Sequence, residues 1–230
     1  MTGPAVMARG RFITLEGGEG GGKSTQLRRL ARHLRGQGID VVETREPGGA
    51  AGAEAIRPLL TQGDVARWDV LSETLLLAAA RRNHVEQTIR PALDAGRWVI
   101  SDRFIDSTRA YQGGARGLDP AVIATLEGWV LDGLMPDLTV ILDLPPETGL
   151  ARAGRRIETA APAAPGAGED RFERMGIDFH QALRQAFLAI AAAEPTRCAV
   201  VDATADIDAV EIAIREVVAS RLAPGRDVGP

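Results

Sequence analysis

A glycine-rich segment, residues 17–24, constrains the fold of this chain more than any other feature. It reads GGEGGGKS and fits the pattern G-x-x-x-x-G-K-[ST]. It follows a short apolar segment typical of a strand (residues 11–16) and precedes a stretch with helical periodicity (residues 24–34). In this context the segment predicts a phosphate-binding loop. Glycines let backbone N–H groups converge on phosphate oxygens, and the helix N-terminus adds the positive end of its dipole.

We expect this loop to bind ATP, with Lys23 bridging the β- and γ-phosphates as a catalytic residue and the Ser24 hydroxyl coordinating Mg²⁺. The candidate ATP-binding residues are Gly17, Gly18, Glu19, Gly20, Gly21, Gly22, Lys23, Ser24 and Thr25. Such a loop predicts triphosphate binding but not the reaction. A kinase, a GTPase switch and a mechanical ATPase all remain possible at this point.

Further strands and helices alternate along the chain. Strand candidates lie at residues 39–44, 98–101, 138–143 and 199–202. Helical patterns lie at residues 53–60, 70–94, 120–131, 172–193 and 207–222, and Gly96 is expected to end the longest of them. Strands that are apolar on both faces and alternate with helices favour a parallel sheet. The predicted fold is therefore α/β, a P-loop NTPase-like, doubly wound, parallel five-stranded sheet flanked by helices.

Two segments depart from this pattern. Residues 157–168 are rich in Ala, Pro and Gly without periodicity, which predicts a mobile loop. They follow a basic cluster formed by Arg152, Arg155 and Arg156, and together they suggest a mobile lid at about residues 152–170. Residues 224–230 are expected to form a flexible tail. We expect residues 1–230 to form a single domain.

The composition narrows the classes of function. Apolar residues make up 45% and charged residues 25%, which is typical of a soluble globular protein and excludes a disordered or collagen-like chain. The 27 basic residues against 31 acidic ones give a net charge of -4, and Lys23 is the only lysine. The arginines are scattered among acidic residues, so the sequence favours neither a nucleic-acid partner nor a membrane partner.

Cysteine usage and hydropathy indicate a compartment. The only cysteine, Cys198, excludes an intramolecular disulfide and is expected to be a buried thiol in a reducing environment. Residues 1–11 contain no apolar segment of the kind found in signal peptides, and the longest aliphatic run, residues 75–80, is far shorter than the ~20 residues that span a bilayer. We therefore expect a cytoplasmic protein. Two histidines, His33 and His84, have charged neighbours in helical patterns, which predicts solvated or half-buried side chains.

Charged side chains also follow the second and third predicted strands. TREPGG (residues 44–49) is followed by Arg57 on a predicted helix, and SDRFIDSTRAYQGG spans residues 101–114. Open α/β sheets bind ligands at the carboxyl ends of their strands. The planar guanidinium groups of Arg57 and Arg103 suit a phosphate monoester, because each can bind two oxygens. Asp102, at the end of the third strand, is a candidate ligand of Mg²⁺.

From residue 12 to about residue 218, the chain resembles the thymidylate kinase family. The resemblance rests on FITLEGGEGGGKST, TREPGG, ISDRFIDSTRAYQGG and PDLTVILDLPPETGLAR, in this order. It implies an ATP-dependent kinase that phosphorylates dTMP to dTDP with the help of Mg²⁺. It also implies small-molecule substrates, dTMP and ATP, and a homodimer.

The resemblance implies roles for residues around the acceptor phosphate and sugar. Glu19 matches a carboxylate that the family directs at the 3′-OH of the deoxyribose. Arg57 and Arg103 match arginines that grip the dTMP phosphate, and Arg103 is thereby also a candidate catalytic residue. Glu46 matches an acid near the phosphate and the metal.

Around the base, the resemblance implies that Arg81 and Gln112 hydrogen-bond the edge of thymine, with the Thr108 hydroxyl beside it. An arginine donates to a carbonyl, and the amide of a glutamine can pair with an imide, which carries both a donor and an acceptor. Leu77 stands where the family commonly has a phenylalanine that stacks on thymine. Stacking is therefore expected to be weaker in this chain or to come from another group.

Two further positions depart from the family pattern. Residues 50 and 51 are alanines where the family usually has Thr-Pro. Gly20 occupies the position where one branch of the family carries a catalytic arginine, so the chain resembles the bacterial branch, whose catalytic arginine comes from the lid. The catalytic candidates in the lid are Arg152, Arg155 and Arg156, and the sequence does not choose among them.

Three other functions are alternatives to this one. The nearest is a kinase that acts on dUMP, dCMP or a deoxynucleoside, although Arg81 together with Gln112 favours thymine. A guanine-specific switch needs an N-K-x-D motif, but the chain has no lysine besides Lys23. A nucleotide-binding scaffold without turnover would have no use for the acceptor-side arginines.

Overall fold

A computed structural model of the chain describes residues 9–159 and 170–222, without the side chains of residues 156–159. The expected tail at residues 224–230 and most of the expected lid lie outside the described residues. The described residues include five strands: β1 (Phe12–Glu16), β2 (Val41–Arg45), β3 (Trp98–Asp102), β4 (Leu138–Asp143) and β5 (Cys198–Asp202).

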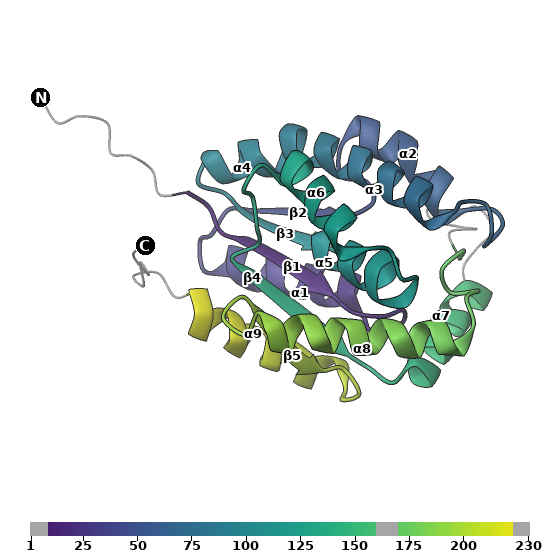
Figure 1. Cartoon of the computed structure of the whole chain (residues 1–230). Helices are drawn as coiled ribbons and strands as arrows, with labels where there is room; N and C mark the ends of the chain where they lie inside the picture. Colours follow the sequence, from purple (N-terminus) through teal and green to yellow (C-terminus); the bar gives the residue numbers. More distant parts are fainter. Residues whose placement is uncertain (1–8, 160–169, 223–230) are drawn as a thin grey trace, which may run out of the picture.

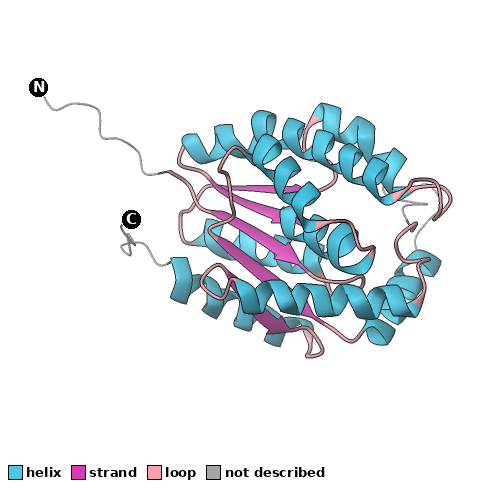
Figure 2. Ribbon diagram, viewed as in Figure 1, coloured by secondary structure: helices cyan, strands magenta, loops and turns pink. Residues whose placement is uncertain are grey.

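These strands form one parallel sheet in the order β2-β3-β1-β4-β5 (Figures 1 and 2). The central strand is β1, where Ile13 is in register with Ile100 of β3 on one side and with Leu138 of β4 on the other. The predicted doubly wound parallel sheet is confirmed. Because the strands are parallel, the segments that follow β1, β2 and β3 all emerge at the same edge of the sheet.

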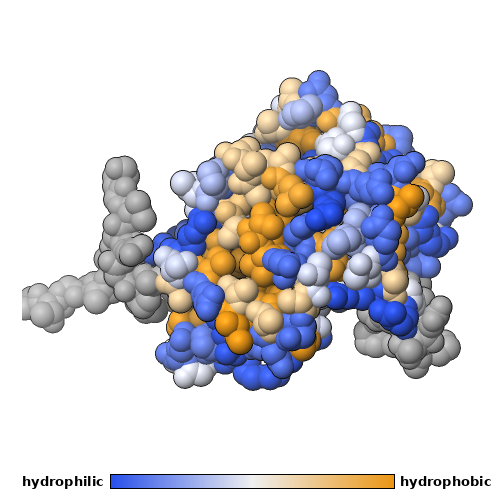
Figure 3. Space-filling model, turned by 90° about the horizontal axis from the view of Figure 1, so that it is seen from below, coloured by the Kyte–Doolittle hydropathy of each residue, from blue (hydrophilic) through white to orange (hydrophobic). Residues whose placement is uncertain are grey.

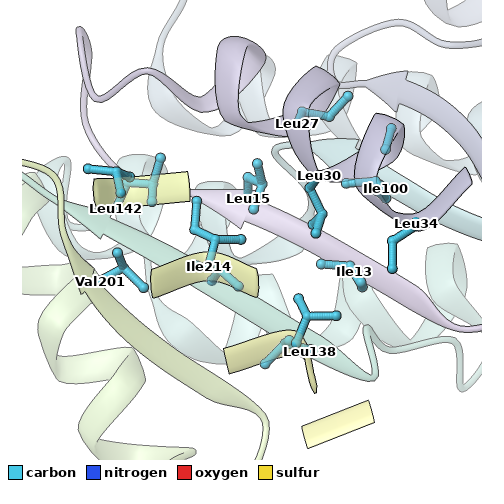
Figure 4. Close-up of a cluster of buried hydrophobic side chains, with 14 of the residues drawn as sticks. Ile13, Leu15, Leu27, Leu30, Leu34, Ile100, Leu138, Leu142, Val201 and Ile214 are labelled. Atoms are coloured by element: carbon cyan, nitrogen blue, oxygen red, sulfur yellow. The ribbon is translucent and has the colours of Figure 1, made fainter. Parts of the chain in front are cut away.

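Helices α1 (Lys23–Gly36) and α9 (Ile207–Leu222) cover one face of the sheet. Leu27, Leu30 and Leu34 of α1 recur at helical spacing and lie in a buried cluster with Ile13 of β1 and Ile214 of α9 (Figure 4). Burying a leucine side chain stabilises a fold by about 1.5–3 kcal/mol. This cluster therefore anchors α1, and with it the glycine-rich loop that precedes α1.

The opposite face carries α3 (Val70–His84), η1 (Val85–Ile89), α4 (Arg90–Asp94) and α6 (Pro120–Leu131). The first three follow one another without a break over residues 70–94, where the sequence predicts one helix. The π-helical turn η1 precedes Pro91, which has no N–H to donate to the preceding turn and whose ring crowds the carbonyl there. Gly96 has a φ of 75°, as expected for the residue that ends this helix.

The remaining helices are α2 (Ala51–Thr61), α5 (Ile105–Thr108), the π-helical η2 (Arg109–Ala115), α7 (Pro146–Thr159) and α8 (Ile177–Ala193). The helix predicted at residues 172–193 is wrong at its start, because residues 171–174 form a turn and Gly176 is the N-cap of α8. The expected loop at residues 157–168 also begins too early, since residues 157–159 belong to α7. Among the residues that the structure describes, none of the helices combines the length and apolar character that crossing a membrane requires.

Candidate active site

The glycine-rich loop connects the end of β1 to the start of α1, and its backbone adopts conformations that favour glycine. The φ angles are 129° at Gly17, 69° at Gly20 and 82° at Gly22, all in the left-handed half of φ space. A Cβ at Gly20 would lie only 2.0 Å from the carbonyl oxygen of Gly149 in α7. The glycines therefore allow both the turn itself and the close approach of α7 to it.

Lys23 is the first residue of α1 and is 7% exposed. Its Nζ donates to the carbonyl oxygens of Gly17 at 3.1 Å and Gly18 at 2.7 Å. Burial, helped by the neighbouring Arg103, lowers the pKa of Lys23 from its ordinary value of 10.5, while the nearby Glu19 opposes this change. The structure thus holds this amine against the loop on which the sequence predicts the phosphates to bind.

The side chains of Ser24 and Asp102 meet where α1 begins and β3 ends. The Ser24 hydroxyl donates to Oδ2 of Asp102. Mg²⁺ commonly takes one or two protein oxygens and completes its octahedron with water and substrate phosphates. The described residues contain no group of three or more His, Cys, Asp or Glu residues that could hold a metal ion. A hydroxyl beside a carboxylate fits a magnesium ion that is shared with a nucleotide, and this role of Ser24 and Asp102 stays a prediction.

A cleft of about 520 Å³ lies at this edge of the sheet. This volume lies within the range of small-molecule sites. Its walls include, among other residues, those predicted from the P-loop and from the acceptor segments: Glu19, Gly20, Gly21, Gly22, Lys23, Ser24, Thr25, Glu46, Arg57, Leu77, Arg81, Asp102, Arg103, Thr108 and Gln112. Gly17 and Gly18 lie beside the cleft. Their carbonyl oxygens accept hydrogen bonds from Lys23, which lines it. The structure thus brings segments from four parts of the sequence to one cavity.

Arg103 crosses this cleft toward the glycine-rich loop. Its guanidinium donates to Glu19 Oε1 at 2.7 Å, to the Gly17 carbonyl at 3.1 Å and to Ser107 Oγ at 3.2 Å. It also lies 4.9 Å from the ring centroid of Tyr111. The backbone φ of Arg103 is 72°, which costs a residue other than glycine about 1–3 kcal/mol. These contacts hold the strained residue in place with its cation in the cleft.

Glu19 is the acidic partner of this cation. Burial alone would raise the pKa of Glu19, but Arg103, Lys23 and the Tyr111 hydroxyl together lower it from 4.5 to about 2. The Tyr111 hydroxyl donates to Glu19 Oε1 at 2.6 Å. Tyr111 is not among the site residues that the sequence predicts. Its place three residues after Thr108 on a helical turn is a signal that could have found it.

Glu46, which follows β2, is buried and has both carboxylate oxygens occupied. Oε2 accepts from Arg81 Nε at 2.7 Å, and Oε1 lies 3.0 Å from Nδ1 of His84. Arg81 and His84 lower the pKa of Glu46 although burial opposes them. The other ring nitrogen of His84 lies 2.6 Å from Thr44 Oγ1. The expectation of a solvated or half-buried His84 is wrong, because two polar partners from the β2 end satisfy a ring that is fully buried.

Arg81 and Gln112 stand on different helices and both line the cleft. Arg81 Nη1 donates to Thr108 Oγ1 at 2.9 Å, and its Nη2 donates to the Phe104 carbonyl at 3.0 Å. The Gln112 amide donates through Nε2 to Glu73 Oε1 at 2.8 Å. Glu73 is not among the site residues that the sequence predicts, and it reaches Gln112 from α3 across 39 residues of sequence.

Neither Arg152 nor Arg155 is among the described residues that line the cleft. Arg152 Nη1 donates to the Ala203 carbonyl at 3.0 Å, beyond the end of β5. Arg155 is exposed on α7. Arg156 belongs to the same helix, and its side chain lies outside the described part of the chain. A catalytic role for any of the three stays a prediction.

Together, these features define a class of enzyme. One cleft combines a phosphate-binding loop and its lysine, a serine–aspartate pair, and arginines suited to a second phosphate. This is the arrangement of an ATP-dependent nucleoside monophosphate kinase.

Comparison with known proteins places the chain within this class. The family model for thymidylate kinase matches residues 15–214. The thymidylate kinase of Caulobacter vibrioides is 53% identical over 216 residues, which cover 94% of this chain and 99% of that protein. The thymidylate kinase of Afipia carboxidovorans is 52% identical over 215 residues, which cover 94% and 91%. The crystal structure of thymidylate kinase from Ehrlichia chaffeensis matches with a TM-score of 0.70 and 35% identity, covering 91% of this chain and 99% of that one. The chain belongs to the thymidylate kinase family.

Proposed function

We propose that this chain transfers the γ-phosphoryl group of ATP to dTMP, giving dTDP and ADP, as one domain with a lid at about residues 152–170. Family membership supports this reaction. The observation that carries it in the structure is the shared cleft, which has Lys23 at one end and Arg103, Arg81 and Gln112 facing the same cavity.

The acceptor oxygen needs little activation, because the second pKa of a phosphate monoester is about 6 and the group is already anionic at neutral pH. This oxygen forms a bond to the γ-phosphorus while the bond to the leaving ADP oxygen breaks. Lys23 and Arg103 lower the barrier by holding the phosphates in line and by neutralising their charge. Mg²⁺ would add further charge neutralisation, and Ser24 and Asp102 are the residues that would hold it.

On the acceptor side, Arg57 and Arg103 bind the dTMP phosphate, and Glu19 faces the deoxyribose 3′-OH as a hydrogen-bond acceptor. The lowered pKa of Glu19 supports this role, because the carboxylate is ionised at neutral pH. Glu46 lines the cleft and holds the guanidinium of Arg81 through the 2.7 Å ion pair. Its place near the phosphate and metal stays a prediction.

At the base, Arg81 donates to a thymine carbonyl, and Gln112 pairs with the imide. Thr108 lies beside the base, fixed by its hydrogen bond from Arg81. Leu77 supplies an apolar contact from α3 in place of a stacked ring.

One or more of Arg152, Arg155 and Arg156 reach the transferring phosphate when the lid closes, and closure excludes water that would otherwise hydrolyse ATP. Replacing each arginine with alanine should identify the catalytic one, because only its loss lowers kcat strongly while leaving ATP affinity nearly unchanged.

The chain acts in the cytoplasm as a homodimer. The buried, unpaired thiol of Cys198 is compatible with a reducing compartment. Apolar side chains on two neighbouring helices support a partner surface, namely Leu71 and Leu75 of α3 and Trp129 of α6, which is 73% exposed. Substitution of Leu75 and Trp129 with glutamate should convert a dimer into a monomer in light-scattering measurements.

A second apolar area lies on the face formed by β5, α8 and α9, where Figure 3 shows hydrophobic side chains gathered. Val200 of β5 is exposed and lines a groove with Ala209 and Ala213 of α9, and Ile212 of the same helix is exposed as well. Glutamate at Val200 and Ile212 is the matched control for the α3–α6 substitutions. Dissociation by this pair alone would assign the dimer to the sheet edge instead.

The reaction is tested with Mg-ATP and a panel of acceptors: dTMP, dUMP, dCMP and thymidine. We expect dTMP to give the highest kcat/KM and the product dTDP. Lys23→Ala should abolish transfer while thermal unfolding stays close to that of the parent chain. Arg32→Ala is the matched control, because Arg32 is an exposed cation on the same helix outside the cleft. An equal or higher kcat/KM with dCMP, or normal turnover by Lys23→Ala, would refute the proposal.

A further inference from the structure

The amide of Gln112 is held by its nitrogen end. The side chain is 1% exposed, and Nε2 donates to Glu73 Oε1 at 2.8 Å. The amide oxygen, Oε1, has no hydrogen-bond partner among the described residues. A carboxylate only accepts hydrogen bonds, so it can pair with the NH₂ group of the amide but not with its oxygen. Glu73 therefore selects the orientation in which the Gln112 oxygen is the end left to bind something else.

Burial and two arginines fix the Glu73 carboxylate in this position. It is fully buried, its Oε1 also accepts from Arg116 Nη1 at 2.6 Å, and its Oε2 pairs with Arg171 Nη1 at 2.5 Å. Arg171 is fully buried too, and it donates to three backbone carbonyls within residues 60–65 at 2.9 to 3.1 Å. Arg171, in the segment before α8, therefore fixes the Glu73 carboxylate, and the carbonyls of residues 60–65 fix Arg171 in turn.

We propose that Glu73 is a positioning residue that sets the base preference of the acceptor site, by holding the Gln112 amide with its oxygen as the free acceptor. This inference rests on the proposed place of the base against Gln112. Thymine and uracil carry a donor at N3, which pairs with such an oxygen, whereas cytosine carries an acceptor there. The neighbouring Arg81 adds a donor to the same wall, which suits the 4-oxo group of thymine and opposes the 4-amino group of cytosine.

The alternative is that Glu73 only stabilises the packing of α3 against the segment after Arg109, which would leave the base preference untouched. The two roles differ in one measurable quantity, the ratio of kcat/KM for dTMP to kcat/KM for dCMP. A purely structural loss lowers both values together. Release of the amide lowers the first and raises the second, because a rotated amide offers Nε2–H to N3 of cytosine.

The experiment measures this ratio in the full chain for Glu73→Leu, which leaves no oxygen to accept from Gln112 Nε2. We expect it to fall roughly tenfold, as an unpaired polar group in the transition state costs on the order of one hydrogen bond. The same substitution made in a Gln112→Met background should leave the ratio unchanged, because there is no amide to turn. Arg116→Gln is the matched control, since it removes a partner of Glu73 but keeps the contact with Gln112, and its ratio should match that of the parent chain.

Where Glu73→Leu gives no folded protein, Glu73→Asp tests the same point. It keeps the charge that faces both arginines and draws the carboxylate away from Gln112, so the ratio should again fall. An unchanged ratio in the folded variant overturns the inference, even where the parent chain prefers dTMP. A parent chain without preference for dTMP over dCMP would instead refute the proposed function itself.

Discussion

A buried carboxyl group at the end of β1 gives the chain a testable dependence of stability on pH. Glu16 is the residue before the glycine-rich loop and is fully buried. Its Oε1 accepts from the backbone N–H of Phe104 at 2.7 Å, and its Oε2 accepts from Ser107 Oγ at 2.6 Å. Burial, and next the charge of Asp106, raise the pKa of Glu16 from 4.5 to about 8.

The raised pKa of Glu16 determines how the stability changes with pH. Because the folded state holds the proton of Glu16 more tightly than the unfolded state, the stabilisation is complete below pH 4.5 and is lost as the pH rises to about 8. At about 1.4 kcal/mol for each pH unit, the contribution of Glu16 to the free energy of unfolding falls by on the order of 4 kcal/mol between pH 5 and pH 8.

Glu16→Gln removes the titration and keeps the contacts. The amide oxygen can accept from the Phe104 N–H, and the amide nitrogen can donate to the Ser107 hydroxyl. We therefore expect the variant to gain stability relative to the parent chain as the pH rises, by on the order of 4 kcal/mol between pH 5 and pH 8.

Urea unfolding at pH 5, 6, 7 and 8 measures this gain as the difference between the two chains, so that all other titrating groups cancel. Glu86→Gln is the control, because the Glu86 carboxylate is partly exposed in ion pairs with Arg82 and Arg90. The difference in the free energy of unfolding between Glu86→Gln and the parent chain should stay nearly constant over these pH values. Parallel pH profiles of Glu16→Gln and the parent chain would show that Glu16 is ionised at neutral pH and that the reasoning is wrong.

Three further predictions concern the cleft. Lys23→Arg should lower kcat at least 100-fold while dTMP affinity by calorimetry stays within about twofold, because a planar guanidinium does not replace a compact ammonium between two phosphates; full activity would contradict this. Leu77→Phe should lower the KM for dTMP by about 2- to 10-fold, since an aromatic pair adds about 0.5–1.5 kcal/mol; an unchanged KM would place the base elsewhere. Gly20→Ala should destabilise the fold in thermal unfolding by more than Gly22→Ala, because both glycines have positive φ but only the Cβ at Gly20 meets Gly149; equal losses would count against that contact.

The strands and most helices could be predicted because each has its own local signal. Leucines at helical spacing marked α1, and the apolar β-branched segments marked the five strands. Gly96 marked the end of the helix over residues 70–94. The π-helical turn in that helix had a local cause in Pro91, but its exact form depended on packing.

The helix formed by α5 and η2 could not be predicted in this way. It contains Gly113 and Gly114, which locally favour a turn. In the structure, a Cβ at Gly114 would lie 2.3 Å from the Cβ of Ala186 in α8. The glycine therefore serves a close approach between two helices, and only the tertiary structure reveals that approach.

The site residues also differ in whether a local sequence signal or only a tertiary contact reveals them. Lys23, Arg103 and Gln112 lie within motifs whose chemistry can be recognised from the sequence. His84 and Glu73 lie on a helix without such a motif, and their partners are 38 to 98 residues away in the sequence. Their burial follows from long-range pairing, which no local pattern encodes.

The contact between Gly20 and Gly149 gives a structural reason for one departure from the family pattern. Gly20 stands where one branch of the family carries an arginine, and in this chain the carbonyl of Gly149 occupies the space next to it. The contact is reciprocal, because a Cβ at Gly149 would lie 2.3 Å from the Glu19 carbonyl. Since α7 begins at Pro146, this pair of glycines brings the helix that leads to the expected lid directly against the phosphate-binding loop. An arginine at Gly20 would push that helix away, so we expect any cation that acts on the transferring phosphate besides Lys23 to come from across the cleft or from α7 itself.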